Sequence, residues 1–374
     1  MQKTRISTIV GTRPEIIRLS KIIKELDKHF NHRLIHTGQN PDPLLKDVFF
    51  EELNIRKPDL YFGGDHNSLG EFLANLFIHI EKELKEFRPD GILILGDTNS
   101  ALSSIIAKRY GITIYHLEAG NRSFDQNVPE EINRKLVDHI SDFNLVYSEI
   151  ARSNLIAEGL HPRHIALIGS PLFEVLNENI DKISQSNILT DLKLEKHKYF
   201  LVSAHRQENV DNPKRLEILV NSLIEIQEKF GIPILVSTHP RTKKLLEKNT
   251  NIAKSKIIFH EPFGFIDYNN LQINSRLVLS DSGTISEEST IMKFNAVTIR
   301  DSMERPEALE SGSIVMCGIN ANEIIEAIHL VENSESCKSP PFEYEIRDTS
   351  SRVVKFISST VRRNNFWIGL RETD

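Results

Sequence analysis

Residues 277 to 288 read Leu277-Val278-Leu279-Ser280-Asp281-Ser282-Gly283-Thr284-Ile285-Ser286-Glu287-Glu288. The apolar run predicts a buried strand, and the small polar residues after it predict the start of a helix. In open parallel α/β sheets this junction is where nucleotides bind, because backbone N–H groups there can hold a phosphate. We therefore expect Ser282 and Gly283 to contact an anion, and Glu288 to reach the hydroxyls of a ribose.

The same alternation of strands and helices runs along the whole chain. Strands are predicted at 6–10, 34–37, 91–95, 113–117, 144–147 and 165–168, and the pattern restarts with 199–203, 234–237, 257–259, 276–279, 297–299 and 313–316. Short β-branched runs separated by helical patterns are typical of parallel sheets covered by helices. We therefore predict two Rossmann-like α/β domains, at residues 1–175 and 176–354, with a C-terminal helix at 355–374 that packs back on the first.

Composition narrows the class of protein and its partners. The 374 residues are 39% hydrophobic and 26% charged, as in ordinary globular proteins, and the net charge of -6 disfavours nucleic acid as a partner. Two widely spaced cysteines, Cys317 and Cys337, argue against a zinc cage and suit a reducing compartment. The N-terminus lacks a signal-peptide pattern and no apolar run could span a bilayer, so we expect a cytoplasmic protein with no membrane partner.

A second candidate site follows the first predicted strand, at Gly11-Thr12-Arg13-Pro14-Glu15. Gly11 allows a tight turn, and Arg13 would stand beside the unpaired N–H groups of a helix start, where a diphosphate is well held. Arg18, one turn further, can add a second positive charge. The structural alternative is a plain helix start with a solvated arginine.

Two carboxylates are predicted just beyond the ends of buried strands. Asp97 follows residues 91–95 and Glu118 follows residues 113–117. Asp97 alone could be a helix cap for residues beginning near Asn99. Glutamate is a poor cap and is seldom placed at a buried strand end, so Glu118 favours a functional interpretation.

Further charged residues follow in Val128-Pro129-Glu130-Glu131-Ile132-Asn133-Arg134. Taken alone, Pro129-Glu130-Glu131 is most simply the first turn of a helix whose dipole the acids complement. In the second half His205 and Arg206 follow residues 199–203, His239 follows residues 234–237, and Arg305 lies beyond residues 297–299. Histidine and arginine at strand ends suit a phosphate or a leaving group, although a lone histidine is more often structural.

Several motifs are absent from the sequence. There is no Gly-x-Gly-x-x-Gly turn after the first strand, no Walker loop, no His-Glu-x-x-His and no Cys-x-x-Cys. Nicotinamide, phosphate-loop and zinc chemistry are therefore disfavoured.

In this order, the segments resemble the non-hydrolysing UDP-N-acetylglucosamine 2-epimerase family, from Gly11 to about Gly318. The resemblance implies two domains of the glycosyltransferase-B type with an active-site cleft between them. It implies catalytic roles for four residues, Asp97, Glu118, Glu130 and His205. It implies a UDP-sugar site that includes Arg13, Arg18, Arg134, Arg206, His239, Ser282, Gly283, Glu288 and Arg305. The family also suggests a homodimer, and its reaction needs no metal or redox cofactor.

Some segments differ from the family's usual pattern. Its early lysine is Arg18 here, and the loop at Asn121-Arg122-Ser123-Phe124-Asp125 is short. These features look more like the branch that converts UDP-2-acetamido-2,6-dideoxy-L-talose to UDP-N-acetyl-L-fucosamine for capsule or O-antigen. The alternatives are ordinary UDP-N-acetylglucosamine 2-epimerase, a glycosyltransferase of the same fold, and a UDP-sugar sensor without turnover. Gly38-Gln39-Asn40-Pro41-Asp42 replaces the usual Gly-Gln-His-Arg, so we expect no allosteric activation by UDP-N-acetylglucosamine.

Overall fold

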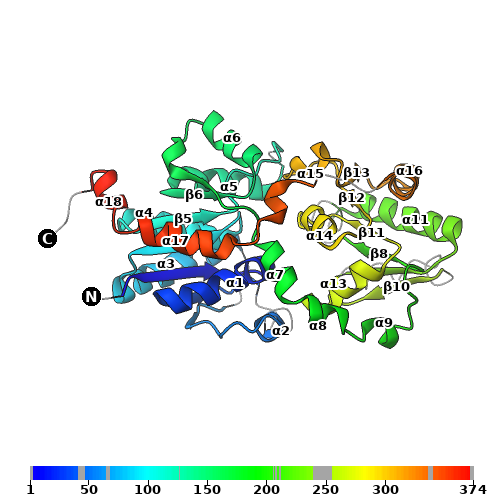
Figure 1. Ribbon diagram of the computed structural model, residues 1–374, viewed down its shortest axis with the longest axis horizontal. Coiled ribbons are helices and arrows are strands. Elements are labelled where there is room, and N and C mark those ends of the chain that lie inside the picture. Colours follow the sequence, from blue (N-terminus) through cyan, green and yellow to red (C-terminus); the bar gives the residue numbers. More distant parts are fainter. Residues whose placement is uncertain are drawn as a thin grey trace. The chain divides into compact units, whose positions relative to one another are not determined.

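The computed structural model describes residues 3–40, 47–64, 68–125, 127–204, 206, 209, 212–238, 255–335 and 340–370 (Figure 1). The chain divides into two compact units. The first joins Met1–Asn177 to Glu345–Asp374, and the second is Glu178–Tyr344. A search of the described helices found none that is both long and apolar enough to cross a bilayer.

The first unit is built on a seven-stranded parallel sheet with the order β3-β2-β1-β4-β5-β6-β7. In chain order the strands are β1 (Arg5–Val10), β2 (Asn31–His36), β3 (Leu60–Tyr61), β4 (Gly91–Leu95), β5 (Thr113–Leu117), β6 (Phe143–Val146) and β7 (Ile165–Leu167). Its helices are α1 (Arg13–His29), α2 (Asp47–Glu52), α3 (Leu69–Phe87), α4 (Ser104–Arg109), α5 (Pro129–Ile140), α6 (Glu149–Ala157), α7 (Leu172–Glu178), α17 (Thr349–Thr360) and α18 (Asn364–Trp367), with short 3-10 turns η2 (Asn99–Ser103) and η3 (Pro162–His164).

The register of β4 against β5 determines where the first unit's carboxylates lie. Gly91 pairs with Thr113 and Leu95 with Leu117, so both strands end at the same level. All five residues of each strand are buried, as expected for central strands with helices on both faces. The residues that follow the two strands therefore begin side by side at one edge of the sheet.

The second unit is built on a six-stranded parallel sheet with the order β10-β9-β8-β11-β12-β13. Its strands are β8 (Phe200–Ser203), β9 (Ile234–Ser237), β10 (Ile257–His260), β11 (Leu277–Ser280), β12 (Ala296–Ile299) and β13 (Val315–Cys317). Its helices are α8 (Ile180–Ser184), α9 (Ile188–Asp191), α11 (Pro213–Phe230), α13 (Phe265–Asn274), α14 (Ile285–Met292), α15 (Glu307–Glu310) and α16 (Ala321–Asn333), with the 3-10 turn η5 (Phe342–Glu345).

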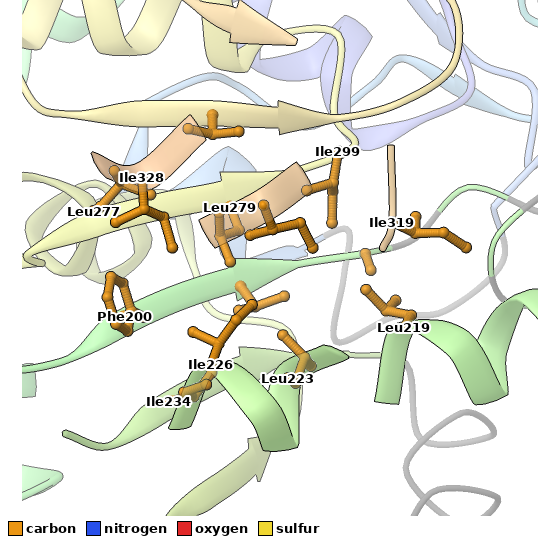
Figure 2. Close-up of a cluster of buried hydrophobic side chains, with 14 of the residues drawn as sticks. Phe200, Leu219, Leu223, Ile226, Ile234, Leu277, Leu279, Ile299, Ile319 and Ile328 are labelled. Carbon is orange, nitrogen blue, oxygen red and sulfur yellow. The ribbon is translucent and has the colours of Figure 1, made fainter. Parts of the chain in front are cut away.

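Helix α11 illustrates how local sequence sets an element and its core face. The Asn212 side chain accepts from the backbone N–H of Lys214, Pro213 occupies the first turn, and Gly231 ends the helix in a left-handed conformation. Its apolar face packs on the sheet, and Figure 2 shows side chains of β8 and β11 meeting Leu223 and Ile226 of α11. Burial of this apolar cluster stabilises the sheet of the second unit.

The predicted strands are confirmed to within a few residues at their ends. Strand β3 was not predicted, because two residues carry no periodic pattern. The predicted second domain ended at 354, whereas residues 345–354 belong to the first unit. The reason is that α17 already docks there at its first turn: Thr349 Oγ1 donates to the Ile168 carbonyl (3.1 Å) and the Ser350 N–H to Glu174 (2.7 Å).

Candidate functional site

Both sheets reverse their strand order at one point, and the predicted motifs lie at those two points. In the first sheet β1 and β4 are neighbours, and in the second β8 and β11 are neighbours. In open α/β sheets ligands bind beyond the carboxyl ends of strands at such switch points. The loops after β1 and β4 carry Arg13 and Asp97, and the loops after β8 and β11 carry Arg206 and Ser282.

In the first unit, one arginine holds both strand-end carboxylates. Arg134, on α5, donates to the Asp97 carboxylate and to the backbone carbonyl of Glu118, and its Nη2 lies 3.3 Å from Glu118 Oε1. The Arg134 side chain is 2% exposed and that of Asp97 17% exposed. The guanidinium is therefore buried against the two acids, and the Asp97 side chain is the most exposed of the three.

Glu118 is fixed from several sides. Its φ of +62 lies in the left-handed region, which costs a non-glycine residue about 1 kcal/mol or more unless neighbours stabilise it. Arg18 Nη1 lies 3.3 Å from Glu118 Oε2, and the Arg18 guanidinium sits 5.5 Å from the centre of the Tyr147 ring. Arg18 and Arg134 together compensate the negative charges of Glu118 and Asp97.

Helix α5 holds Asp97 in place. The 3-10 turn η2 begins at Asn99, and the side chain of its N-cap residue, Thr98, makes no capping hydrogen bond. The Asp97 side chain pairs with Arg134, and Asn133 of α5 donates to the Asp97 carbonyl (3.0 Å) and to Asn99 (3.0 Å). The ion pair with Arg134 favours the functional interpretation of Asp97.

Helix α5 begins at Pro129, as predicted, and its two acidic residues differ in burial. Glu131 is buried and accepts from the N–H of Ser123 (2.9 Å). Glu130 is exposed in the first turn, four residues before Arg134 and therefore on the same face of the helix. Of the two, Glu130 is the one whose carboxylate is accessible to a substrate.

The turn after β1 is organised by Glu15, whose role sequence reasoning missed. The buried Glu15 carboxylate accepts from the N–H groups of Gly11 (2.8 Å) and Thr12 (2.6 Å) and from the hydroxyl of Thr98 (2.8 Å). Thr12 and Glu15 have capping-box spacing, which was the available signal. Because Thr98 follows Asp97, Glu15 ties the first strand-end loop to the loop of a catalytic candidate.

Burial strongly affects the ionisation of Glu15. Desolvation raises the pKa of this carboxyl to about 7, against the hydrogen bonds from Gly11, Thr98 and Thr12, which lower it. Arg13 begins α1 next to this group, is half-buried, and lies 5.7 Å from the centre of the Phe49 ring. The loop after β1 thus combines a positive side chain with a helix N-terminus, an arrangement suited to phosphate.

In the second unit, Arg206 connects three loops. Its backbone N–H donates to the Asp281 carboxylate (3.0 Å), its Nε to the Asp281 carbonyl (3.2 Å) and its Nη2 to Glu304 (2.7 Å). Asn209 also donates to Asp281 (3.1 Å). These contacts bind the loops after β8, β11 and β12 to one another.

Arg305 fixes the Ser282-Gly283 turn from below. It pairs with the buried Glu287 and donates to the Gly283 carbonyl (2.7 Å). No acceptor among the described residues takes the Gly283 N–H, and the nearest atom to a Cβ placed at Gly283 would be Arg300 Nη1 at 4.0 Å. The turn therefore presents an N–H group and open space beside a buried guanidinium, as an anion site requires.

Glu288 lies on α14, in its first turn. Its carboxylate accepts from Gln272 Nε2 (2.7 Å), and both residues are buried. The contact holds the Glu288 carboxylate in place. Gln272 was not singled out from the sequence, because a glutamine inside α13 carries no pattern of its own.

The remaining predicted residues, His205 and His239, lie outside the described residues. Within the first unit the structure thus brings together Asp97, Glu118, Arg134 and Arg18, with Arg13 on the neighbouring loop. Within the second it brings together Arg206, Ser282, Gly283 and Arg305 around the end of β11. The first set can exchange protons with a substrate, and the second can hold an anion.

Comparisons with known proteins agree on one family. A family model described as UDP-N-acetylglucosamine 2-epimerase matches residues 24–358. The structure of UDP-N-acetylglucosamine 2-epimerase from Rickettsia bellii is 40% identical, with a TM-score of 0.93 and coverage of 99% of this chain and 100% of that chain. The Methanocaldococcus jannaschii UDP-GlcNAc 2-epimerase in complex with UDP-GlcNAc and UDP is 36% identical, with a TM-score of 0.88 and coverage of 95% and 100%.

A third relative is named for another sugar. The UDP-2,3-diacetamido-2,3-dideoxy-D-glucuronate 2-epimerase of Pseudomonas aeruginosa is 32% identical over 86% of this chain and 91% of its own length. The solved structures confirm the predicted fold class of two parallel-sheet α/β domains of the glycosyltransferase-B type. The chain therefore belongs to the UDP-N-acetylglucosamine 2-epimerase family, whose members are isomerases.

Proposed function

We propose that this protein inverts C2 of a UDP-linked 2-acetamido sugar by eliminating UDP and adding it back. The observation that carries the proposal is the pair Asp97 and Glu118, held at neighbouring strand ends by Arg134 in a chain of this family. Two carboxylates and a bound nucleotide are the groups that such a reaction needs.

The chemistry follows from the weak acidity of the C2 proton. A pyranose without an adjacent carbonyl does not release this proton directly. When the bond between C1 and the diphosphate oxygen breaks, UDP leaves with the electron pair and C1 becomes oxocarbenium-like. A carboxylate then takes the acidified C2 proton, and a double bond forms between C1 and C2.

The return step restores the bond and inverts the centre. A carboxylic acid protonates C2 from the opposite face, and a diphosphate oxygen adds to C1. Atoms and electrons balance without a redox cofactor. Carboxylates must therefore serve both faces of the ring, and we assign these roles to Asp97, Glu118 and Glu130.

Other residues support binding in this proposal. Ser282, Gly283 and Glu288 hold UDP, while Arg13 and His205 meet the diphosphate. Arg134 and Arg18 orient the carboxylates, and Arg206 and Arg305 orient the loops of the nucleotide site, as their contacts indicate. His239 is assigned to the substrate by the family pattern.

We propose UDP-N-acetylglucosamine as the first substrate to test, with UDP-N-acetylmannosamine as its product. The two solved relatives, at 40% and 36% identity, are named UDP-N-acetylglucosamine 2-epimerases. The short loop that favoured a 6-deoxy-L-sugar is largely tied into the protein: Arg122 is buried and pairs with Asp138 and Glu158. Its sequence is therefore a weaker indicator of substrate contacts than the comparison with relatives.

UDP-2-acetamido-2,6-dideoxy-L-talose, for capsule or O-antigen synthesis, is the second candidate. Within the loop, Phe124 is 73% exposed and has a φ of +55, so one side chain does project from it. The relative named for a glucuronate shows that members of the family differ in sugar. The two substrates are separated by measuring kcat/KM for each with the purified protein.

The mechanism is tested with the isosteric variants Asp97→Asn, Glu118→Gln and Glu130→Gln. Each removes a proton acceptor from the sugar site, so kcat should fall by about 100-fold or more, in the range known for lost acid–base groups. UDP affinity, measured by calorimetry, should stay within about threefold, because the nucleotide contacts are unchanged. Near-normal turnover in all three variants would contradict the mechanism.

A further inference from the structure

One face of α5 carries three charged residues at intervals of four: Glu130, Arg134 and Asp138. Residues so spaced lie one above another along a helix. Glu130 is exposed at the start of the helix, Arg134 holds the two site carboxylates, and Asp138 is fully buried toward the end. The proposed mechanism gives Asp138 no role.

Asp138 contacts the loop that carries Glu118. Its two oxygens accept from the Gly120 N–H at 3.3 Å and 3.2 Å, and Oδ2 also accepts from Arg122 Nη1 at 2.7 Å. Arg122 is itself anchored by two contacts of 2.7 Å to Glu158. Burial alone would raise the pKa of Asp138, but His116, Arg122 and Arg134 hold it below its ordinary value.

Asp138 also reaches the loop that carries Asp97, through a histidine. His116, fully buried on β5, has Nδ1 2.8 Å from Asp138 Oδ1 and Nε2 2.7 Å from the Gly96 carbonyl oxygen. Because a carbonyl oxygen can only accept, the Nε2 of His116 must carry a proton and donate it to this contact. Gly96 immediately precedes Asp97.

Both loops contain residues in left-handed backbone conformations, and one of these residues is not a glycine. Gly96, Glu118 and Gly120 have φ values of +70, +62 and +79, all in the left-handed region. A Cβ at Gly120 would lie 2.3 Å from the Ala151 carbonyl oxygen, so this turn is also packed tightly. A non-glycine residue such as Glu118 keeps such a conformation only where its surroundings enforce it.

We propose that Asp138 is a positioning residue for the epimerisation. Through the Gly120 N–H, and through His116 to the Gly96 carbonyl, it fixes the backbone of the two turns that aim Glu118 and Asp97 at the sugar. The inference rests on the proposed roles of these two carboxylates. Asp138 contacts only the backbone and neighbouring side chains of the turns, whereas Arg134 also holds the Asp97 and Glu118 carboxylates themselves.

The test is Asp138→Asn, which keeps the shape of the side chain. Both Asp138 oxygens accept from the Gly120 N–H, so the NH2 group that replaces either oxygen must face this donor. The turns should shift, and kcat should fall by about 10- to 100-fold, as expected for small misplacement of catalytic groups. UDP affinity should stay within about threefold, because the nucleotide site is unchanged.

Asp142→Asn is the matched control. Asp142 is also buried and accepts from a cation, Lys108 (2.7 Å), and from a backbone N–H of β5, that of Ile114 (2.9 Å). Asp142 lies at the opposite end of β5 from the site. The Asp142→Asn variant should lower the melting temperature as much as Asp138→Asn does while keeping kcat near the wild-type value.

Three results overturn the inference. Asp138→Asn could retain wild-type kcat, it could lose no more kcat than Asp142→Asn, or it could lose UDP affinity in step with kcat. If it fails to fold, His116→Gln takes its place, because that change leaves Asp138 its contacts with Arg122 and Gly120 and carries the same prediction. Asp97→Asn is measured beside them: full activity in that variant refutes the proposed function, whereas an inactive Asp97→Asn with an unaffected Asp138→Asn refutes only the positioning role.

Discussion

At the residue scale, Arg134 brings together two carboxylates that would otherwise repel each other. Its fork of donors reaches Asp97, the Glu118 carbonyl and the Glu118 carboxylate at once. Arg134→Lys leaves a single compact charge that cannot make these contacts together, so kcat should fall by about 100-fold. Steady-state kinetics check this prediction, with the exposed Arg352→Lys on α17 as a control that should behave as wild type. Equal kcat for Arg134→Lys and Arg352→Lys would show that the fork is not needed.

Glu15 gives a pH dependence whose sign can be worked out. Burial raises the pKa of Glu15 from 4.5 to about 7, so the folded protein holds this proton more tightly than the unfolded chain. Its contribution to stability is therefore fully present below pH 4.5 and lost as the pH rises through 7. The shift corresponds to about 3 kcal/mol of unfolding free energy.

Glu15→Gln cannot titrate and should lack this dependence. The free energy of unfolding of the wild type, taken relative to Glu15→Gln, should fall steadily between pH 5 and pH 8. Urea denaturation of both proteins across that range measures it. Parallel pH profiles would mean that Glu15 titrates normally in the folded protein.

The sequence predicted where some site residues lie, but it did not predict which side chains they contact. Asp97 and Glu118 were predictable, because a polar residue directly after a buried strand must lie at the sheet edge. Their contacts with Arg134 were not, since they depend on how α5 packs across the sheet. Arg206 and Arg305 stay predicted substrate residues, and their ion pairs with Glu304 and Glu287 carried no signal in the sequence. A charged sequence motif predicts a cluster of charged side chains, but it does not predict which of these side chains form ion pairs with each other.

At the element scale, strands were predictable and the docking of helices was not. Buried parallel strands read as continuous apolar runs, so β4, β5 and β9 were predicted at the bounds that the structure shows. The C-terminal segment was expected to return to the first domain, and α17 does pack on α1. Its start at Thr349 depends on hydrogen bonds to Ile168 and Glu174, distant residues that no local pattern indicates.

Helix α17 should therefore contribute to the stability of the first unit. Ile357 on its inner face is fully buried, and Thr360 is hydrogen-bonded to the Tyr115 hydroxyl of β5 (2.7 Å). Ile357→Ala should destabilise the protein by about 3 kcal/mol, the usual cost of such a cavity. Calorimetric melting checks it, with the exposed neighbour Ser358→Ala as the control. A melting temperature equal to that of Ser358→Ala would show that α17 contributes little.

At the scale of the whole molecule, the proposed function gives nucleotide binding and proton transfer to different units. Most of the proposed UDP contacts lie in the second unit, and the carboxylates proposed to transfer protons lie in the first. Saturation with UDP at about 100 times its Kd should raise the free energy of unfolding by about 2.7 kcal/mol. Asp97→Asn should show the same gain in unfolding free energy. Gly283→Val adds a side chain beside the open Gly283 N–H and should show a smaller gain. Loss of the UDP effect in Asp97→Asn would contradict the separation.

The central claim is that the C2 proton of the sugar is removed and replaced during turnover. Proton NMR of the purified protein in deuterated water tests it most directly, with UDP-N-acetylglucosamine and UDP-2-acetamido-2,6-dideoxy-L-talose in separate tubes. We predict that deuterium enters C2 of the true substrate as its epimer forms, and that Asp97→Asn abolishes the exchange. A UDP-sugar that binds and keeps its C2 proton in both tubes, or an epimer that forms without deuterium, would contradict the account.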